Sequence, residues 1–259
     1  MRIAILGAGR MGSWLANTLR KDHELIVRDS DASHAEALGG IGRWERDEEL
    51  RAFDPELFIN CVPLGSTVAA FKAHEMLLGP ACMLADIASV KTGLPAYYAA
   101  SARPFVSTHP MFGPTHADEA NLHEQNAVII KESCDTGKAF FRSLYAGLGI
   151  RIFEEGFDEH DRTVAYSLAT PFASTMVFAA CMRELDAPGT NFRKHLDIAR
   201  GLLAEDDTLL AEILFNPHTV RQLELINSRL AYLSHIIKDR DHDEMGKFLA
   251  GLRKNIGMS

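Results

Sequence analysis

The sequence places a histidine and a serine where an enzyme that oxidises a hydroxyl group would need them. His109 comes directly after the apolar run Phe105–Thr108, in the segment STHPMFG, and Ser89 follows the preceding apolar run, in LADIASVK. Removing a hydride from an alcohol requires a group that accepts the hydroxyl proton, and histidine is the residue used most often. We therefore predict that His109 is the catalytic base, with Ser89 nearby. The alternative is a loop histidine that is bonded to backbone.

A glycine-rich loop near the N-terminus predicts a dinucleotide site. Gly7, Gly9 and Gly12 form the pattern GxGxxG after the apolar run Arg2–Leu6, and a helical pattern begins at Ser13. In such a loop the first glycine permits a tight turn, the second lets the backbone approach a pyrophosphate, and the third lets the helix pack on the strand. The helix N-terminus then offers N–H groups to the phosphates. The residues predicted to bind the cofactor are Gly7, Gly9, Arg10, Met11, Gly12 and Asp29.

Asp29 favours NAD over NADP as the cofactor. It ends the second apolar run, 17 positions after Gly12, where a carboxylate would accept hydrogen bonds from the adenosine ribose. A 2′-phosphate at the same place would be repelled by this charge. Arg28 and Arg10 leave NADP open, because a nearby arginine can bind a 2′-phosphate.

The order of apolar and helical patterns predicts the elements that position these residues. Apolar runs alternate with helix-compatible stretches up to about residue 155, which indicates a mostly parallel sheet with helices on both faces. The runs are 2–6, 24–27, 57–63, 82–87, 105–108, 127–130 and 150–154. From about residue 158 only amphipathic segments follow. We predict an α/β fold, with a Rossmann-type dinucleotide-binding domain over residues 1–156 and an all-helical domain over 157–259 for substrate binding and dimerisation.

One helical segment carries a regular apolar stripe. Apolar residues recur in steps of three and four at Leu223, Ile226, Leu230, Leu233 and Ile237. Such a stripe is the seam of a helix pair. It is either a core face within one subunit or the interface of a homodimer, and both alternatives stay open at this point.

Composition limits the class of protein. The formal net charge of -8 argues against binding to nucleic acid, and the four cysteines are scattered without a CxxC pair, which is typical of a reducing compartment. No apolar run suggests a membrane helix, and the glycine loop begins too early to leave room for a signal peptide. We expect a cytoplasmic protein that acts on a small molecule without nucleic acid or membrane.

The motifs GAGRMG, ADIASVK, STHPMFGP and EHDR, in this order and spacing, resemble the prephenate/arogenate dehydrogenase family of tyrosine biosynthesis. The resemblance spans nearly the whole chain. It implies oxidation of the ring hydroxyl of prephenate or arogenate with NAD(P), followed by loss of CO2. It also implies that His109 accepts the hydroxyl proton, that Ser89 bonds His109 and the substrate, and that Arg193 in the segment NFR binds a substrate carboxylate. His160 and Asp161 match the HD pair that begins the helical half, and His160 is expected at the substrate.

One position departs from the family pattern. The family usually has a histidine about twelve residues after the HD pair, where this chain has Phe172. A phenyl ring cannot bond a carboxylate or carbonyl, so the side-chain end of the substrate must be held differently. We expect prephenate as the substrate, with arogenate as the alternative. Two further alternatives are a β-hydroxyacid-type dehydrogenase, which uses a lysine in the helical half, and an NAD-sensing module without catalysis.

Overall fold

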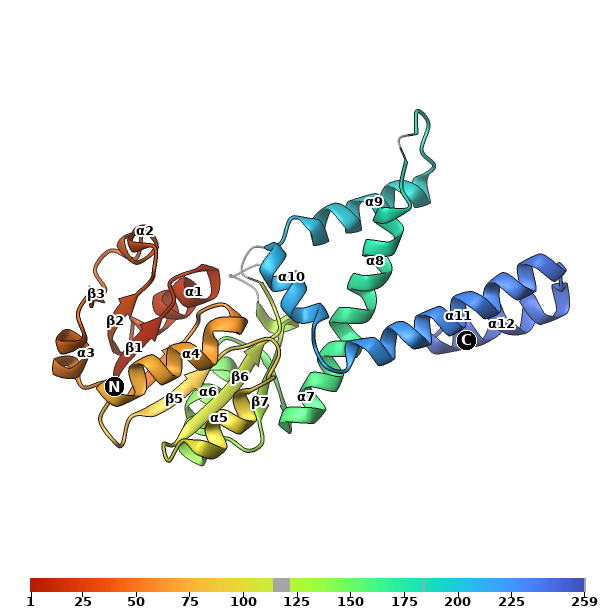
Figure 1. The fold of residues 1–259 in the computed structure, drawn as a ribbon. Helices are drawn as coiled ribbons and strands as arrows, with labels where there is room; N and C mark the ends of the chain where they lie inside the picture. The colour runs from red at the N-terminus through yellow and green to blue at the C-terminus, as the bar shows by residue number, and fades with distance from the viewer. Residues whose placement is uncertain (114–121, 184, 259) are drawn as a thin grey trace.

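The computed structural model describes residues 1–113, 122–183 and 185–258. Its first half is built on one eight-stranded sheet with the order β3-β2-β1-β4-β5-β6-β7-β8 (Figure 1). The strands are β1 (Arg2–Leu6), β2 (Glu24–Arg28), β3 (Gly42–Arg43), β4 (Leu57–Asn60), β5 (Met83–Asp86), β6 (Phe105–Pro110), β7 (Asn126–Ile130) and β8 (Arg151–Glu155). The predicted mostly parallel sheet is confirmed, and the two-residue β3 is an addition to it.

The sheet is parallel from β3 to β6, and the one antiparallel pairing within the described residues joins β6 to β7. His109 lies at this pairing, opposite Val128. Strand β4 (LFIN) is buried along its whole length, because helices cover both faces of the sheet. A strand covered on both faces reads as a continuous apolar run, which is how the sequence revealed it.

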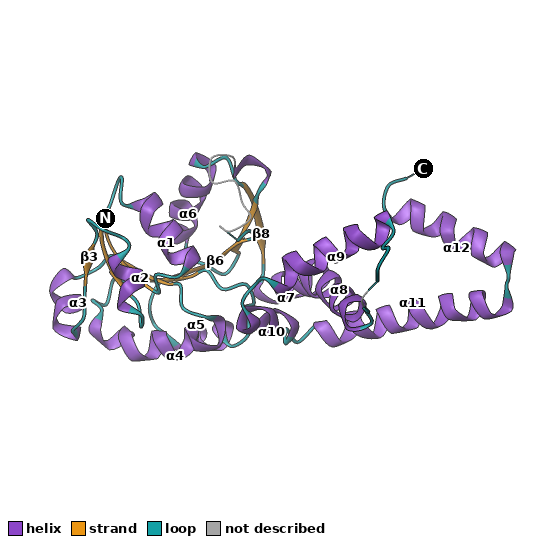
Figure 2. Ribbon diagram, turned by 90° about the horizontal axis from the view of Figure 1, so that it is seen from above, coloured by secondary structure: helices purple, strands orange, loops and turns teal. Residues whose placement is uncertain are grey.

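Helices pack on both faces of the sheet and create two apolar cores. Neighbouring residues of β1 point to opposite faces, so Ile3 and Ile5 belong to one core and Ala4 and Leu6 to the other. Figure 2 shows the helices on either side of the strands. They are α1 (Arg10–Leu19), α2 (Ala32–Glu36), α3 (Asp47–Phe53), α4 (Leu64–His74), α5 (Leu94–Ala100) and α6 (Asp135–Gly147), with short 3-10 turns at Glu75–Leu77 and Leu122–Glu124.

The second half of the chain is helical, as predicted. It contains α7 (Phe157–Val164), a π-helical turn η3 (Ala165–Ala169), α8 (Thr170–Ala180), α9 (Thr190–Leu203), α10 (Asp207–Leu214), α11 (Thr219–Asp239) and α12 (His242–Asn255). Helices α8 and α9 form one arm and α11 and α12 a second, and both extend away from the sheet, whereas α10 turns back toward it (Figure 1). Gly156, the predicted domain boundary, lies between β8 and α7.

The continuous helical stretch Phe157–Ala180 is long and apolar enough to cross a membrane, by length and composition only. This corrects the expectation that no segment meets that criterion. The evidence for a membrane span is weak, because the stretch begins with the charged residues Asp158 and Glu159, and its His160 and Asp161 are buried against the sheet half. Only 17% of its most apolar window is buried inside the chain.

The apolar stripe of α11 is largely uncovered in a single chain. Leu230 is 56% exposed and Ile237 is 59% exposed, while Ile226 and Leu233 on the same stripe are half-buried. These exposures do not fit the alternative in which the stripe is a core face within one subunit.

Candidate active site

The glycine loop has the geometry of a dinucleotide-binding turn. Gly7 has a φ of +96°, and a Cβ on it would lie 2.7 Å from the backbone of Cys61 at the end of β4. A Cβ on Gly12 would lie 1.9 Å from the Gly7 carbonyl oxygen, so only glycine lets α1 pack this closely on the loop. A Cβ on Gly9 would meet nothing within 4 Å, which leaves open space beside the backbone. Each predicted role of a glycine thus has a structural counterpart.

The loop opens onto a groove of about 780 Å³. The groove lies at the carboxyl ends of β1, β4 and β5, where the strand order reverses between β1 and β4, the usual ligand position in an open α/β sheet. Helix α10 of the second half forms the opposite wall. Arg10, Met11 and Asp29 line the groove together with Gly7, Gly9 and Ser89. The predicted cofactor residues therefore lie together, and the space and backbone approach fit a dinucleotide.

Asp29 is held by the loop itself. Its Oδ2 accepts a hydrogen bond from the Ala8 N–H at 2.5 Å, and its Oδ1 accepts one from the Asp31 N–H at 2.8 Å. The side chain is 12% exposed. A carboxylate has about four lone-pair sites, so capacity remains for a ribose hydroxyl.

His109 begins a chain of hydrogen bonds that joins the two halves of the molecule. Its Nδ1 lies 3.0 Å from Nε2 of His160, whose Nδ1 lies 3.0 Å from Oδ1 of Asp161. Asp161 Oδ1 also accepts the Lys91 N–H at 2.8 Å, and the Asp161 carbonyl accepts Asn216 Nδ2 at 2.8 Å. His109, His160 and Asp161 are all buried. The HD pair on α7 is thus joined to the histidine on β6 by a hydrogen bond inside the molecule.

The carboxylate at the end of this chain determines the tautomers. An ionised carboxylate only accepts hydrogen bonds, so His160 Nδ1 carries a proton toward Asp161. His160 Nε2 is then an acceptor, and His109 Nδ1 must donate to it. His109 Nε2 is left without a proton, which is the form that a general base requires. Burial lowers the pKa of His109 well below its usual value, and nearby His160 and Lys91 lower it further, so the ring is neutral at pH 7. Burial likewise lowers the pKa of His160 to about 3.

A buried ion pair between Lys91 and Asp86 connects the end of β5 to β6 next to His109. Lys91 Nζ donates to Asp86 Oδ1 at 2.7 Å and to the Thr108 carbonyl at 2.8 Å, and both charged side chains are fully buried. Tyr98 donates to the other Asp86 oxygen at 2.8 Å. Burial lowers the pKa of Lys91, and the charge of Asp86 opposes this shift. Because Lys91 bonds the residue before His109, the pair fixes the backbone of the candidate base.

Only part of this arrangement could be identified from the sequence. His109, Ser89, His160 and Asp161 were singled out, but the Lys91–Asp86 pair was missed. The available signal was the segment ADIASVK, in which an acid and a lysine flank the end of a buried strand.

The other predicted site residues are placed as follows. Ser89 is half-buried and lines the groove. His160 uses both ring nitrogens in the chain described above, so its predicted contact with substrate stays a prediction. Arg193 is exposed on α9 and is not among the groove-lining residues of the described chain, so its carboxylate-binding role also stays a prediction. Pro114, the last residue of STHPMFGP, lies outside the described residues.

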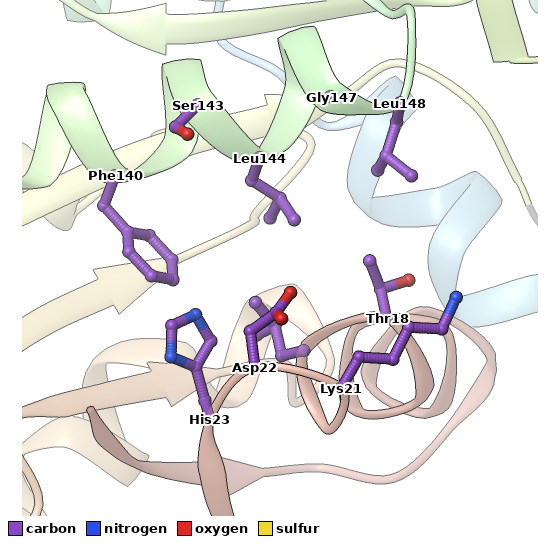
Figure 3. A pocket seen from close by; sticks show the side chains of 10 residues that line it. Thr18, Lys21, Asp22, His23, Phe140, Ser143, Leu144, Gly147 and Leu148 are labelled. Carbon is purple, nitrogen blue, oxygen red and sulfur yellow. The ribbon is translucent and has the colours of Figure 1, made fainter.

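A second cavity, of about 390 Å³, lies between the end of α1 and helix α6. Figure 3 shows Phe140 and Leu144 on α6, and Leu148 just after it, facing His23 and Lys21 across the cavity. This cavity contains neither the glycine loop nor the strand ends that carry Ser89 and His109. The larger groove is therefore the candidate active site.

The fold and the site together define a class of protein. It has a Rossmann-type nucleotide-binding half, a helical half, a groove lined by residues of both halves, and a buried histidine on the sheet that is hydrogen-bonded to the helical half. Residues 15–151, more than half of the chain, match the family model "Prephenate dehydrogenase, nucleotide-binding domain". The chain belongs to this family of dehydrogenases and is an oxidoreductase with a nucleotide-binding domain. The resemblance inferred from the motifs is thereby confirmed.

Curated relatives align along almost the whole chain. Arogenate dehydrogenase 2 of Arabidopsis thaliana is 23% identical over 269 residues, which cover 97% of this chain and 74% of the relative. A probable arogenate/prephenate dehydrogenase of Methanocaldococcus jannaschii is 23% identical over 278 residues, which cover 99% of this chain and 61% of the relative. The chain thus spans about three-quarters of one relative and about three-fifths of the other.

A solved structure has the same fold over the whole chain. The crystal structure of prephenate dehydrogenase from A. aeolicus, in complex with hydroxyphenyl propionate and NAD+, superposes with a TM-score of 0.85 at 17% identity. The alignment covers 100% of this chain and 98% of that one. The predicted fold class, a Rossmann-type sheet followed by helices, is confirmed.

Proposed function

We propose that this protein oxidises prephenate with NAD, transferring the hydride from ring C4 to the nicotinamide while CO2 is lost and 4-hydroxyphenylpyruvate forms. The single observation that carries the proposal is the hydrogen-bonded series Asp161–His160–His109, which leaves Nε2 of His109 without a proton. His109 is buried and is not itself among the described residues that line the groove, whereas Ser89 is. The family membership and the NAD+ in the A. aeolicus complex support the cofactor. Arogenate is the competing substrate, since two aligned relatives from Arabidopsis thaliana are arogenate dehydrogenases.

The glycine loop and Asp29 would bind the dinucleotide. Gly9 leaves space for the pyrophosphate, the N-terminus of α1 offers N–H groups and a positive dipole end, and Asp29 accepts from the adenosine ribose. When bound, the nicotinamide accepts the hydride. His109 and His160 are buried, and burial lowers the pKa of both side chains, so both are neutral at pH 7. A charged ring without a partner would be costly at these buried positions.

His109 Nε2 would accept the hydroxyl proton as the hydride leaves. The new charge on the ring is then stabilised through His160 by the Asp161 carboxylate, in the manner of a base that is oriented by a second and a third group. Burial disfavours the protonated ring, so the proton is held only briefly and passes on as the product forms. Ser89, three residues after the end of β5, would bond the same hydroxyl.

The test is turnover measured as absorbance at 340 nm with NAD and either prephenate or arogenate. We expect prephenate to be oxidised, and His109→Asn to lower kcat by about 10²–10⁴, the usual contribution of a positioned acid–base group, with little change in NAD affinity. His235→Asn, which removes an exposed histidine on α11, is the matched control. A His109→Asn protein that retains more than about a third of the wild-type kcat, or a wild type that binds NAD without forming NADH, refutes the proposal.

We also propose that the active form is a homodimer joined through the helical half. The two arms expose large apolar side chains, including Val177 (61%), Ile198 (59%), Leu203 (54%) and Leu230 (56%). Apolar exposure on this scale is typical of a subunit interface. A second copy of the chain is the occupant that would cover equivalent arms by symmetry. Sedimentation or light scattering that finds only monomer at micromolar concentration would contradict this.

A further inference from the structure

We propose that Glu205, just before α10, is a cofactor-specificity residue that keeps Arg10 from binding the 2′-phosphate of NADP. The inference rests on the proposed dinucleotide site and addresses the question that Arg10 left open. Arg10 follows the second glycine of the loop and lines the groove, so it is one of two arginines there that could serve a 2′-phosphate.

The guanidinium of Arg10 is already paired with a carboxylate of the helical half. Arg10 Nη1 lies 3.1 Å from Glu205 Oε2 and donates to it, a contact that bridges 195 positions of sequence. The Glu205 side chain is 19% exposed and that of Arg10 is 58% exposed, so the carboxylate is the better-fixed partner. A phosphate would have to compete with this carboxylate for the same N–H donors, because guanidinium binds both groups in the same way.

Helix α10 is also hydrogen-bonded to the sheet half of the molecule. Asp206 caps its N-terminus by accepting the Leu209 N–H at 3.0 Å. Glu212, near the other end of α10, accepts the Gly65 N–H at the start of α4, at 2.5 Å. The bond from Gly65 to Glu212 ties α10 to α4, and the Asp206 cap, which lies within α10, fixes its first turn. Glu205 directly precedes this turn, so its position next to Arg10 follows from the placement of α10.

The charges of the side chains that line the groove also favour NAD over NADP. Among the described residues that line it, the carboxylates of Asp29, Asp206 and Glu212 outnumber the guanidiniums of Arg10 and Arg28. Glu205 neutralises one of those two arginines. A 2′-phosphate brings up to two further negative charges into this region, where like charges repel, whereas the ribose hydroxyl of NAD only donates to the acid.

The experiment is calorimetric titration of the intact protein with NADH and with NADPH, which needs no substrate. In Glu205→Gln we expect the Kd for NADPH to fall about tenfold, the worth of a hydrogen bond to a charged group, while the Kd for NADH changes less than about threefold. The double variant Glu205→Gln with Arg10→Gln should lose the gain. Asp207→Asn removes the same charge two residues away, on an exposed side chain of α10, and should leave both Kd values unchanged.

Several outcomes overturn the inference. These are an unchanged Kd for NADPH in Glu205→Gln, an equal change for both cofactors, or a gain that persists without Arg10. A wild type that binds NADPH more tightly than NADH also overturns it. Because the readout is binding, failure of prephenate turnover would refute the proposed function and leave this inference standing.

Discussion

Acid should weaken the fold through the histidines at the site. The pKa of His160 is lowered to about 3 in the folded protein, while an unfolded histidine titrates near 6.5. As the pH falls below 6.5, His160 therefore binds a proton in the unfolded chain but stays neutral in the folded protein. The free energy of unfolding falls as the pH falls. Over the interval from pH 7 to pH 5 this one residue costs about 2 kcal/mol of unfolding free energy. His109, whose pKa is also lowered by burial, acts in the same direction.

The assay is urea denaturation at pH 7, 6 and 5 on the wild type and on His160→Asn. The variant is less stable at every pH, because it loses the hydrogen bonds to His109 and Asp161. It should nevertheless lose about 2 kcal/mol less than the wild type between pH 7 and pH 5, since one titrating site is gone. Burial raises the pKa of Asp161, which works in the opposite sense, but this residue is present in both proteins.

His235→Asn serves as the control, because its side chain is 72% exposed and gains no buried environment on folding. Its loss of stability between pH 7 and pH 5 should equal that of the wild type. If wild type and His160→Asn lose the same free energy over this interval, His160 is not buried in the neutral form and the tautomer argument for His109 loses its basis.

Four further predictions concern cofactor, substrate and assembly. Asp29→Ser should narrow the preference for NAD over NADP in kcat/KM, since it removes the charge that repels a 2′-phosphate; an unchanged ratio would point to other residues. Arg193→Ala should raise KM for prephenate by about 30-fold or more with a smaller effect on kcat if this arginine pairs with a carboxylate, and steady-state kinetics with an unchanged KM would remove it from the site. Phe172→His should alter the ratio of kcat/KM for prephenate and arogenate. If the wild type prefers one substrate by more than about a thousandfold and the variant leaves this preference unchanged, other residues distinguish the keto and amino side chains of the two substrates. Leu230→Glu combined with Ile237→Glu should halve the mass measured by light scattering, because charges at a dimer seam are costly to bury; a retained dimer mass would place the interface elsewhere.

Much of the fold could be predicted because buried parallel strands leave continuous apolar runs. The glycine loop could be predicted in detail, since the packing of Gly7 and Gly12 excludes any side chain. Strand β3, by contrast, has only two residues and exposed side chains, so it leaves no pattern. Lys91 was missed because a lysine is expected at the surface, and only the folded chain brings Asp86 and the Thr108 carbonyl to its amine.

The site was predicted best where neighbouring strands end together. Ser89 and His109 could be assigned to adjacent strand ends from order alone, and β5 and β6 are indeed paired. The hydrogen bond between His109 and His160, which are 51 positions apart, could not be derived from the spacing of the sequence motifs. It depends on the direction in which α7 leaves the sheet after Gly156. The cytoplasmic location, the absence of nucleic-acid partners and the two-domain division stay predictions.

The π-helical turn Ala165–Ala169 changes the rotational phase of everything that follows it. In an unbroken α-helix, a residue twelve positions after His160 would lie about 120° around the axis from it, at about 100° per residue. A π-turn accommodates one extra residue and so removes about 100° of that rotation. Phe172 is thereby returned to within about 20° of the direction in which His160 faces the sheet half. Deleting one residue of this turn would leave the composition of the helix almost unchanged and yet aim position 172 at a different side of the molecule.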